Sequence, residues 1–363
     1  MSYLRVAVIG VGHLGQAHAR VLSAIPDVEL VGVADANIEQ AETVAARHNT
    51  RAYSHFGPLL DQVDAASIVV PTSHHCSVAT AFLDRGVPVL IEKPLALDVD
   101  QAVRIVELAD RRGCIVQVGH IERFNPAYEA LTRLPIRPRY VSCERVGPFT
   151  GRSLDVGAVL DLMVHDLDLV AALDGTAVTR VEALGVSVIG EHEDVANARL
   201  HFASGCVADF SVCRIAPVPR RTMQVWAAEG VASVDFSTRS LSLIQPSEGL
   251  RRNGLQFAGN DVGARDAIKA EMFGKHLLVQ DSVCEASNDQ LTAELLNFVD
   301  CVRTGRQPRV NGAAGLAAVD LAGRVVASLR QHAWTGNETG PRGPRDLPAI
   351  NGTLIPTSSR AAA

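Results

Sequence analysis

The stretch RVAVIGVGHLGQAHARVLSAI, residues 5–25, decides the fold of the first half of the chain. It runs from a β-rich segment (6–9) through Gly10, Gly12 and Gly15 into a helical pattern. The apolar residues of that pattern fall on one helical face: Leu14, Ala17, Val21, Leu22 and Ile25. In such a strand–turn–helix unit the first glycine permits the tight turn, the second lets a pyrophosphate approach the backbone, and the third lets the helix pack against the strand. The stretch therefore predicts a dinucleotide site, with phosphates bound to free N–H groups at the helix N-terminus.

An acidic residue after the next strand favours one nicotinamide cofactor. The run VELVGVAD (28–35) ends in Asp35, which lies 20 residues beyond Gly15. A carboxylate at this position accepts hydrogen bonds from both ribose hydroxyls and repels a 2′-phosphate. Ala36 and Asn37 supply no positive charge to offset that repulsion. We therefore predict NAD rather than NADP as the cofactor; the alternative is that Asp35 serves only as a turn or cap residue.

Strand-like and helix-like runs alternate over the following residues. Buried strands are predicted at 65–70, 87–92 and 114–119, and helices at 75–86 and 98–113, each helix ending in glycine. Such alternation is typical of a parallel, doubly wound sheet. Ligands bind beyond the carboxyl ends of the strands in sheets of this kind.

LIEKPLAL, residues 90–97, places a lysine at one of these strand ends. Of the 34 Lys and Arg residues only three are lysines, and a partly buried lysine, unlike arginine, can have its pKa pulled toward neutrality. Pro94 pushes Lys93 out of helical geometry, and an X-Pro bond of this kind is compatible with a cis peptide. Pro71-Thr72 and Gly119-His120 lie at neighbouring strand ends. We therefore expect Lys93 to carry chemistry on the ligand side of the sheet.

Bulk composition limits the class of protein. A chain of 363 residues predicts two domains, and 47% hydrophobic with 20% charged residues is ordinary globular composition. A net charge of −6 argues against a nucleic-acid partner. No signal peptide or membrane span is predicted, because no apolar run approaches ~20 residues. Seven cysteines without a CxxC pair suggest reduced thiols and a cytoplasmic location. His74, His75 and Cys76 are adjacent and poorly spaced to share one ion, so no metal is predicted.

The second half of the chain has a different pattern. Strand-like runs separated by turn residues predict an antiparallel sheet with one solvated face; they are 139–146, 180–190, 195–203, 206–214 and 221–230. We predict domains at 1–122 and 123–333, followed by a loose tail at 334–363. Two structural helices are predicted at 287–305, capped by Ser287 or Asn288 and ended by Gly305, and at 313–331. Residues 246–265 are predicted to form a long loop.

One helix, VLDLMVHDLDLVAAL (159–173), interrupts the strand pattern. It is largely apolar, but Asp161, His165 and Asp168 follow one another at spacings of four and three, on a separate stripe. Charged groups in such a helix need partners or a ligand. A metal site, a structural Asp–His pair and a catalytic pair are the three interpretations.

Five motifs together resemble the Gfo/Idh/MocA oxidoreductase family. GVGHLG, Asp35, PTSHH, IEKPLAL and DLMVHDLD occur in the family's order over roughly residues 4–330. The resemblance implies an N-terminal Rossmann domain and a C-terminal α/β domain with a large, mostly antiparallel sheet. It implies hydride transfer between a nicotinamide and a hydroxyl carbon of a sugar or cyclitol. It also implies a homo-oligomer, a dimer or tetramer. Met163 stands where many relatives carry glycine, and we expect it to narrow or reshape the pocket.

The resemblance also assigns site residues. The cofactor contacts that it implies are Gly10, Gly12, His13, Leu14, Gly15, Asp35, Thr72, His75 and Glu92. The catalytic residues that it implies are Lys93, Asp161 and His165, which favours the catalytic interpretation of the helix. His165 suits a general base because its reference pKa is near ~6.5. Asp161 would orient or polarise it, and Lys93 would stabilise the developing negative charge. The lysine and histidine could also exchange these roles.

VGHIERFNPAYEAL (118–131) resembles family members that act on nucleotide-linked amino sugars such as UDP-N-acetylglucosamine. Arg123 and Asn125 would contact the substrate together with Lys93, Asp161 and His165, and Arg123 and Arg152 would meet a diphosphate. Asn125 with its following proline is equally typical of a turn or helix start.

Three functional hypotheses follow. The first is NAD-dependent oxidation of a nucleotide-linked amino sugar at C3. The second is a dehydrogenase of a free sugar or inositol. The third, a nicotinamide-binding sensor without turnover, conflicts with the complete set of Lys93, Asp161 and His165, which a binder would not need.

Overall fold

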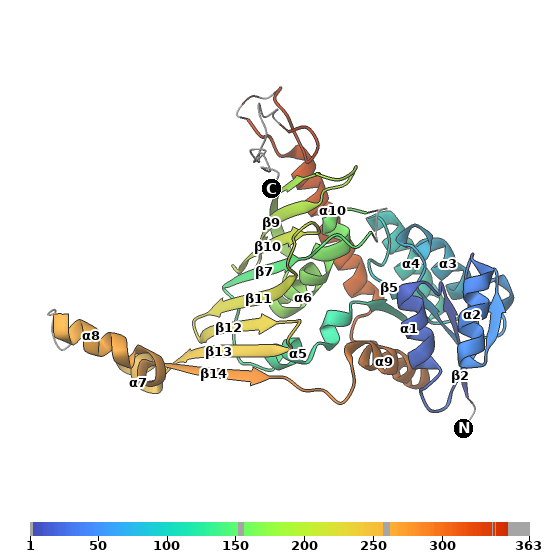
Figure 1. The fold of residues 1–363 in the computed structure, drawn as a ribbon, viewed down its shortest axis with the longest axis horizontal. Coiled ribbons are helices and arrows are strands. Elements are labelled where there is room, and N and C mark those ends of the chain that lie inside the picture. Colours follow the sequence, from blue (N-terminus) through green and yellow to red (C-terminus); the bar gives the residue numbers. More distant parts are fainter. Residues whose placement is uncertain (1–2, 152–155, 257–261, 336, 338, 348–363) are drawn as a thin grey trace, which may run out of the picture.

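The computed structural model describes residues 3–151, 156–256, 262–335, 337 and 339–347. It has two sheets, each with its own helices, and they lie at opposite sides of the body in Figure 1. Statements about structure below refer to these residues.

The first sheet has six parallel strands in the order β3-β2-β1-β4-β5-β6. Its strands are Leu4–Ile9 (β1), Val28–Ala34 (β2), Arg51–Tyr53 (β3), Ala65–Ile68 (β4), Val89–Glu92 (β5) and Val116–Gly119 (β6). The order reverses between β1 and β4, which makes their carboxyl ends the crevice where ligands bind. The predicted doubly wound parallel sheet is confirmed.

Helices cover both faces of this sheet. Helices α1 (His13–Leu22), α2 (Ile38–His48) and α9 (Gln290–Thr304) share one core with it. Helices α3 (His75–Leu83) and α4 (Val99–Arg112) cover the other face. Short 3₁₀ turns occur at Gly57–Leu59, Thr72–His74 and Ile121–Phe124.

Helix α9 reaches the first sheet from the far end of the chain. Its Leu295 and Phe298 are fully buried beside α1. Asp289 caps its N-terminus by accepting a hydrogen bond from Thr292 N (2.9 Å), so the predicted cap at Ser287 or Asn288 is wrong. The predicted end at Gly305 is confirmed. The predicted domain boundaries stay a prediction, and α9 lies within the second of those ranges although it packs on the first sheet.

The second sheet has eight strands in the order β14-β13-β12-β11-β7-β10-β9-β8. They are Tyr140–Val146 (β7), Val178–Val186 (β8), Val195–Phe202 (β9), Val207–Cys213 (β10), Arg220–Ala227 (β11), Gly230–Asp235 (β12), Ser240–Pro246 (β13) and Leu277–Val283 (β14). Every neighbouring pair is antiparallel except β7–β10. The predicted large, mostly antiparallel sheet is confirmed.

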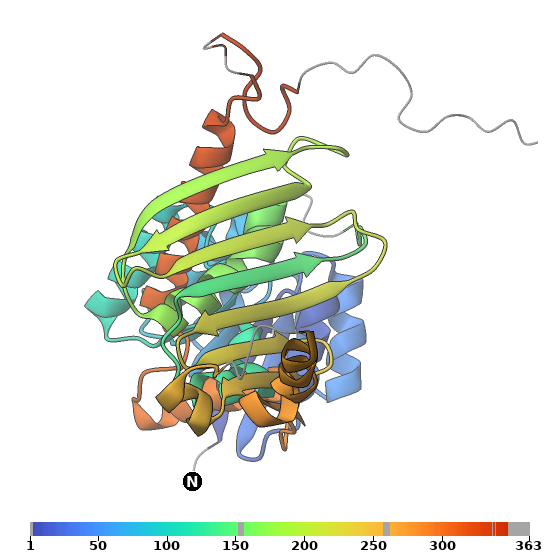
Figure 2. The ribbon, with the colours of Figure 1, turned by 90° about the vertical axis from the view of Figure 1, so that its left-hand side faces the viewer.

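Helices cover the inner face of the second sheet. They are α5 (Pro126–Thr132), α6 (Val164–Asp174) and α10 (Gly312–Gln331), and most of the outer face is bare in Figure 2. A π-helical turn, Val159–Met163, leads into α6. Met163 in this turn is fully buried in the second core. Its side chain therefore packs in that core, and its effect on the shape of the substrate pocket stays a prediction.

Helix α10 connects the two cores. It is long and apolar enough to span a membrane by length and composition alone. Its Val319 packs in the core of the first sheet, however, and Leu321 and Val325 pack in the core of the second. Helix α10 is therefore the central helix of a two-sheet fold.

An arm extends from the edge of the second sheet (Figure 1). Its helices are α7 (Glu248–Asn253) and α8 (Val262–Glu271), so the predicted loop at 246–265 is partly wrong. A kinked turn, Met272–His276, in which Phe273 and Gly274 leave helical geometry, then leads into β14. Residues 257–261 of that loop lie outside the described residues.

The predicted tail is described only as far as residue 347. In this part Trp334 Nε1 donates to Gly343 O (2.7 Å), and Ala333 and Arg342 form an isolated β-bridge. Residues 348–363 of the tail lie outside the described residues.

Candidate active site

The glycine turn after β1 brings helix α1 against the sheet. A Cβ on Gly15 would lie 1.9 Å from Gly10 O, and one on Gly10 would lie 2.5 Å from Val69 O. Gly10 also has a φ of +87°, which disfavours any other residue. Around Gly12 there is no atom within 4 Å of the added carbon. Packing therefore requires glycine at positions 10 and 15, whereas Gly12 leaves space for a phosphate at the N-terminus of α1.

Asp35 lies at the end of β2 beside this turn. Its Oδ2 accepts a hydrogen bond from Val11 N (2.8 Å) and its Oδ1 from Asn37 N (2.9 Å). Asp35 therefore has the turn-capping role that was the alternative to ribose binding. It also lines the cavity along the carboxyl edge of the sheet. Each carboxylate oxygen keeps a further lone pair that can accept from a ribose hydroxyl.

Replacing Asp35 by serine should shift cofactor preference toward NADP. The variant loses the charged acceptor for two hydroxyls and the repulsion of a 2′-phosphate, so we expect the NAD-to-NADP affinity ratio to fall roughly 10- to 100-fold. Titration calorimetry of both cofactors measures the ratio. Asp61→Ser, at a surface ion pair with Arg85, is the control. An unchanged ratio in Asp35→Ser would leave Asp35 with its turn role alone.

A cavity of about 830 Å³ follows the carboxyl edge of the first sheet. Eight predicted cofactor residues line it: Gly10, Gly12, His13, Leu14, Asp35, Thr72, His75 and Glu92. Lys93 lies at its opposite end from Asp35 and also lines it. Gly15 lies under the turn instead. His75 is buried, with its ring nitrogens 2.8 Å from Pro94 O and 2.9 Å from Val70 O, so its side chain supports the wall. These residues fit a dinucleotide whose ribose is at Asp35 and whose nicotinamide is near Lys93.

Lys93 connects the first sheet to the second domain. Its peptide bond to Pro94 is cis. Its Nζ donates to Asp161 O (2.8 Å) and Asp161 Oδ1 (3.2 Å) in the π-helical turn before α6. A π turn holds more residues than an α turn, so the helical spacing that put Asp161 and Asp168 on one stripe does not hold here. Asp161 contacts Lys93, whereas Asp168 pairs with Arg123. The catalytic lysine and aspartate that the sequence predicted are therefore in direct contact.

His165, one turn after Asp161, is partly exposed, but its Nδ1 is buried and has no hydrogen-bond partner. Burial holds the pKa of His165 well below its usual value, and the positive charges of Lys93, Arg145, His120 and Arg221 lower it further. The imidazole is therefore neutral near pH 7 and able to accept a proton.

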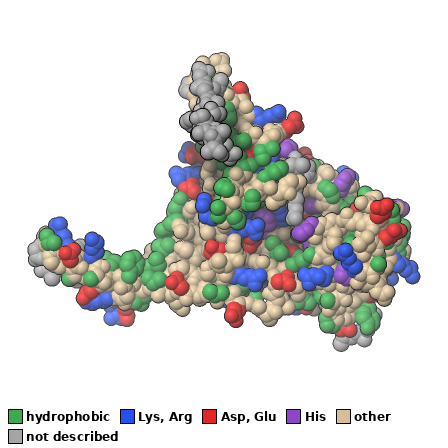
Figure 3. Space-filling view, viewed as in Figure 1, with side chains coloured by type: hydrophobic (Ala, Val, Ile, Leu, Met, Phe, Trp, Pro, Cys, Tyr) green, Lys and Arg blue, Asp and Glu red, His purple; other side chains and the backbone are tan. Residues whose placement is uncertain are grey.

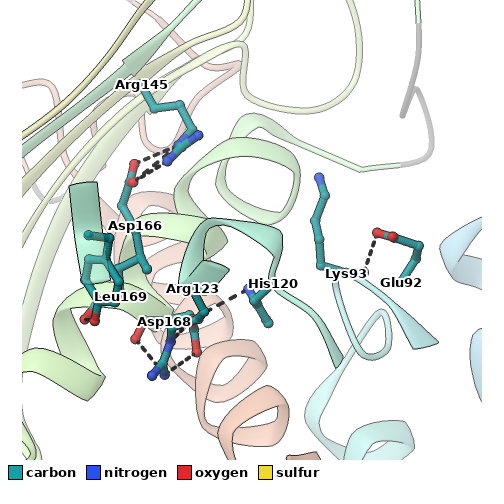
Figure 4. Close-up of polar contacts among 9 residues, drawn as sticks. Glu92, Lys93, His120, Arg123, Arg145, Asp166, Asp168 and Leu169 are labelled. Atoms are coloured by element: carbon teal, nitrogen blue, oxygen red, sulfur yellow. Dashed lines mark hydrogen bonds and ion pairs between the residues drawn. The ribbon is translucent and has the colours of Figure 1, made fainter. Parts of the chain in front are cut away.

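His120 is a residue of the site that the sequence analysis left unassigned. Its ring meets that of His165 edge-on, with centroids 6.2 Å apart. Its Nδ1 lies 4.0 Å from Asp168 Oδ2, as Figure 4 shows. It is buried and neither ring nitrogen has a hydrogen-bond partner. The sequence had placed it at a strand end on the ligand side of the sheet, and the structure confirms this position directly after strand β6. Histidine, Lys and Arg side chains gather in the hollow between the two lobes (Figure 3).

Two predicted substrate contacts have protein partners in the structure. Arg123 donates from Nε and Nη2 to the two carboxylate oxygens of Asp168 (2.6 and 2.8 Å). Asn125 caps α5 by accepting from Ala127 N, and its amide donates to Glu122 Oε2 and to Phe236 O. The structure therefore gives Asn125 the helix-start role, and both of its donors are used. Arg152 lies outside the described residues.

A buried arginine supports the helix that carries His165. Arg145 on β7 binds Asp166 through Nε and Nη2, the shorter contact being 2.7 Å, and binds Glu122 Oε1 through Nη1 (2.9 Å). Its guanidinium also lies 5.5 Å from the centroid of the Phe236 ring. Arg145, Glu122 and Asp166 are all almost completely buried. Figure 4 shows the contact between Arg145 and Asp166. This cluster fixes α6 against the sheet and thereby positions His165.

A second buried polar cluster lies behind Lys93. His18 of α1 contacts Ser67 Oγ (2.8 Å) and Glu92 Oε1 (3.1 Å), and Glu92 Oε2 accepts from Lys93 N. Burial works to raise the pKa of Glu92, but the hydrogen bond from His18 and the charges of His18 and Lys93 outweigh it and lower that pKa. Glu294 of α9 is fully buried with no partner for either oxygen. Burial, and then the charge of Glu92, raise the pKa of Glu294 well above its usual value.

Glu294→Gln should stabilise the protein relative to wild type, by an amount that grows as pH rises. The carboxyl of Glu294 has a raised pKa in the folded state, so the unfolded chain loses this proton first, near its reference pKa of about 4.3. Wild-type stability therefore falls with rising pH, up to the folded-state pKa. The variant lacks this loss, so its advantage should be larger at pH 8 than at pH 5 in denaturant titrations. Glu107→Gln, on the exposed face of α4, should show no such trend; an identical trend in both variants would contradict the assignment.

The glycine turn, the acidic residue at β2 and the lysine at the end of the cavity define a nicotinamide-dependent oxidoreductase. Residues 4–120 match the family model of an oxidoreductase family with an NAD-binding Rossmann fold, and residues 137–233 match the GFO/IDH/MocA C-terminal domain. The chain belongs to the GFO/IDH/MocA oxidoreductase family. Its cofactor is NAD, and relatives in this family are dehydrogenases that act on hydroxyl groups.

Two relatives show the range of substrates near this chain. It is 39% identical over 275 residues, 75% of this chain and 87% of the relative, to UDP-N-acetylglucosamine 3-dehydrogenase of Acidithiobacillus ferrooxidans. A solved structure of that organism's enzyme superimposes with a TM-score of 0.79 at 35% identity, covering 91% of this chain and 98% of the other. The chain is 30% identical to scyllo-inositol 2-dehydrogenase (NAD(+)) of Bacillus subtilis, over 59% of this chain and 68% of the relative.

Proposed function

We propose that this protein oxidises C3 of UDP-N-acetylglucosamine to the 3-keto sugar, with NAD as the oxidant. The contact between Lys93 Nζ and Asp161, at the nicotinamide end of the cavity and beside His165, carries the chemical part of the proposal. The substrate part is supported by the relative that shares 39% identity over 275 residues. A non-catalytic sensor is disfavoured because a binder has no need of a lysine held at this position by a carboxylate.

The chain's own groups can manage the proton of the reaction. NAD, when bound, accepts the hydride from the alcohol carbon. The neutral imidazole of His165 takes the hydroxyl proton as general base. Lys93 donates a hydrogen bond to the same oxygen and stabilises the negative charge that develops on it. Asp161 holds the ammonium group of Lys93 in place. The reverse division of roles between Lys93 and His165 uses the same contacts.

A substrate panel tests the proposal. Purified protein with NAD is mixed separately with UDP-N-acetylglucosamine, UDP-glucose, N-acetylglucosamine, glucose and myo-inositol, and NADH is followed by absorbance. A parallel series contains a 2-oxo acid that can reoxidise retained NADH. NADH formation with UDP-N-acetylglucosamine alone supports the proposal, and NMR of the product then identifies the oxidised carbon. Turnover of inositol or a free sugar instead favours the second hypothesis.

We further propose a cytoplasmic homo-oligomer, either a dimer or a tetramer. Seven free cysteines favour a reducing compartment. The bare outer face of the second sheet favours association (Figure 2). Light scattering of the purified protein measures the oligomeric state, and the mass of a monomer would reject the proposed dimer or tetramer.

A further inference from the structure

Arg221 is an arginine near the catalytic histidine that lacks an acidic partner. It is the second residue of β11, it is exposed, and it lies directly opposite Arg145 in the β11–β7 register. Opposite residues in an antiparallel pair project to the same face of the sheet. Arg221 therefore projects to the inner face, where Arg145 binds Asp166, the neighbour of His165.

Lys93, Arg123 and Arg145, the other described Lys and Arg residues around His165, each form an ion pair. Lys93 pairs with Asp161, Arg123 with Asp168, and Arg145 with Asp166 and Glu122. Among the described residues no carboxylate lies within ion-pair distance of Arg221. Within the part of the chain that the structure describes, Arg221 is thus an exposed cation near His165 that forms no ion pair.

We propose that Arg221 binds the diphosphate of the substrate and so selects a nucleotide-linked sugar over a neutral sugar or cyclitol. The inference rests on the proposed function. In a UDP-linked hexose the diphosphate is attached at C1, one sugar ring away from C3, so its partner must lie close to the base that acts at C3. Arg221 meets this requirement, and the planar guanidinium suits bidentate binding of phosphate. Arg123, which the sequence suggested for this role, is already bound to Asp168.

Binding of the anion would also strengthen the base. The groups that act on His165 from neighbouring elements are Lys93, Arg145, His120 and Arg221. Asp161 lies in the π-helical turn before the helix of His165, and the helix itself carries Asp166 and Asp168. Arg221 is among the cations that lower the pKa of this imidazole. A diphosphate paired with Arg221 offsets that effect. A neutral substrate brings no such charge, so selection acts on catalysis as well as on binding.

Arg221→Gln and Arg220→Gln form a matched pair for the test. Arg220 is the preceding residue, projects to the opposite face, and pairs there with Glu144 (2.8 Å). Binding of UDP to the NAD-loaded protein is measured by calorimetry, without turnover. Arg221→Gln should weaken UDP binding and lower kcat/KM for UDP-N-acetylglucosamine roughly 10- to 100-fold, with NAD affinity unchanged. Arg220→Gln should change neither more than about twofold. UDP affinity and kcat/KM of Arg221→Lys should lie between those of wild type and Arg221→Gln. Lysine keeps the positive charge but lacks the planar guanidinium that binds phosphate in a bidentate manner.

The pH profile gives a second measurement. The pKa of the base seen in kcat/KM, which reports the free enzyme, should be higher in Arg221→Gln than in wild type. Wild-type UDP affinity in Arg221→Gln, or equal losses in both glutamine variants, would overturn the inference while leaving the proposed function intact. If wild-type protein neither binds UDP nor oxidises UDP-N-acetylglucosamine, the proposed function itself fails.

Discussion

Lys93→Met should lower kcat by roughly a thousandfold while leaving NAD affinity within a few fold. The substitution keeps the length and apolar stem of the side chain but removes the ammonium group at the end of the cavity. Losing one donor to the developing oxyanion typically costs about 10²–10³ in kcat, and loss of proton-transfer assistance adds to this. Asp161 keeps partial solvent exposure, so its unpaired carboxylate should not unfold the protein. Initial rates with the substrate identified by the panel measure the effect.

Lys275→Met is the matched control for this change. Lys275 lies in the arm and pairs with Glu271 on the surface (2.6 Å), so its loss should leave kcat unchanged. Unaltered turnover in Lys93→Met would show that the lysine has no part in the chemistry. A parallel loss of NAD affinity would instead assign it to cofactor binding.

Arg145→Met should lower the free energy of unfolding by about 3–5 kcal/mol. Removing one partner of a buried ion pair leaves an uncompensated charge, and here Asp166 and Glu122 both lose their partner. Burial already works to raise the pKa of Asp166, and Arg145 opposes that shift. In the variant this carboxyl should therefore take up a proton on folding, and the destabilisation should be smaller at pH 5 than at pH 8. Urea titrations at the two pH values measure both effects.

Adding Asp166→Asn and Glu122→Gln to Arg145→Met should restore much of the lost stability, because no buried charge then remains. Arg199→Met breaks a surface pair with Asp209 and should cost much less than Arg145→Met. If Arg145→Met unfolds at the wild-type urea concentration, the cluster does not hold α6 in place. If the triple variant is no more stable than Arg145→Met, unpaired charge is not the cause of the loss.

The sequence predicted the first sheet well because its signals are local. The glycine turn, Asp35 and the alternation of strands and helices are all set by spacings within about 30 residues. Helix α9 could not be placed in this way. Its amphipathic pattern predicted a helix, but the choice of the first sheet as its partner depends on contacts with α1, more than 260 residues away.

The predicted catalytic residues lie together for a related reason: the carboxyl ends of parallel strands meet at one edge, and Lys93 is at such an end. The π-helical turn at 159–163 has no comparable sequence signal. The pairing of Asp161 with Lys93 and of Asp168 with Arg123 was therefore not predictable. Arg145 and Arg221 were missed because their importance depends on the register of β7 with β11. A buried arginine in a strand looks like any other charged residue until its neighbours are known.

The contribution of α9 to the first sheet has a consequence for synthesis of the protein. A ribosome delivers residues 1–122 well before Leu295, Phe298 and Glu294 leave the exit tunnel. During that interval the α1 face of the nascent sheet lacks its last apolar cover, and Gln117 lacks the carbonyl of Glu294 to which its side chain donates. The NAD-binding half is thus made first but completed late, and its order of folding is set by the end of the chain.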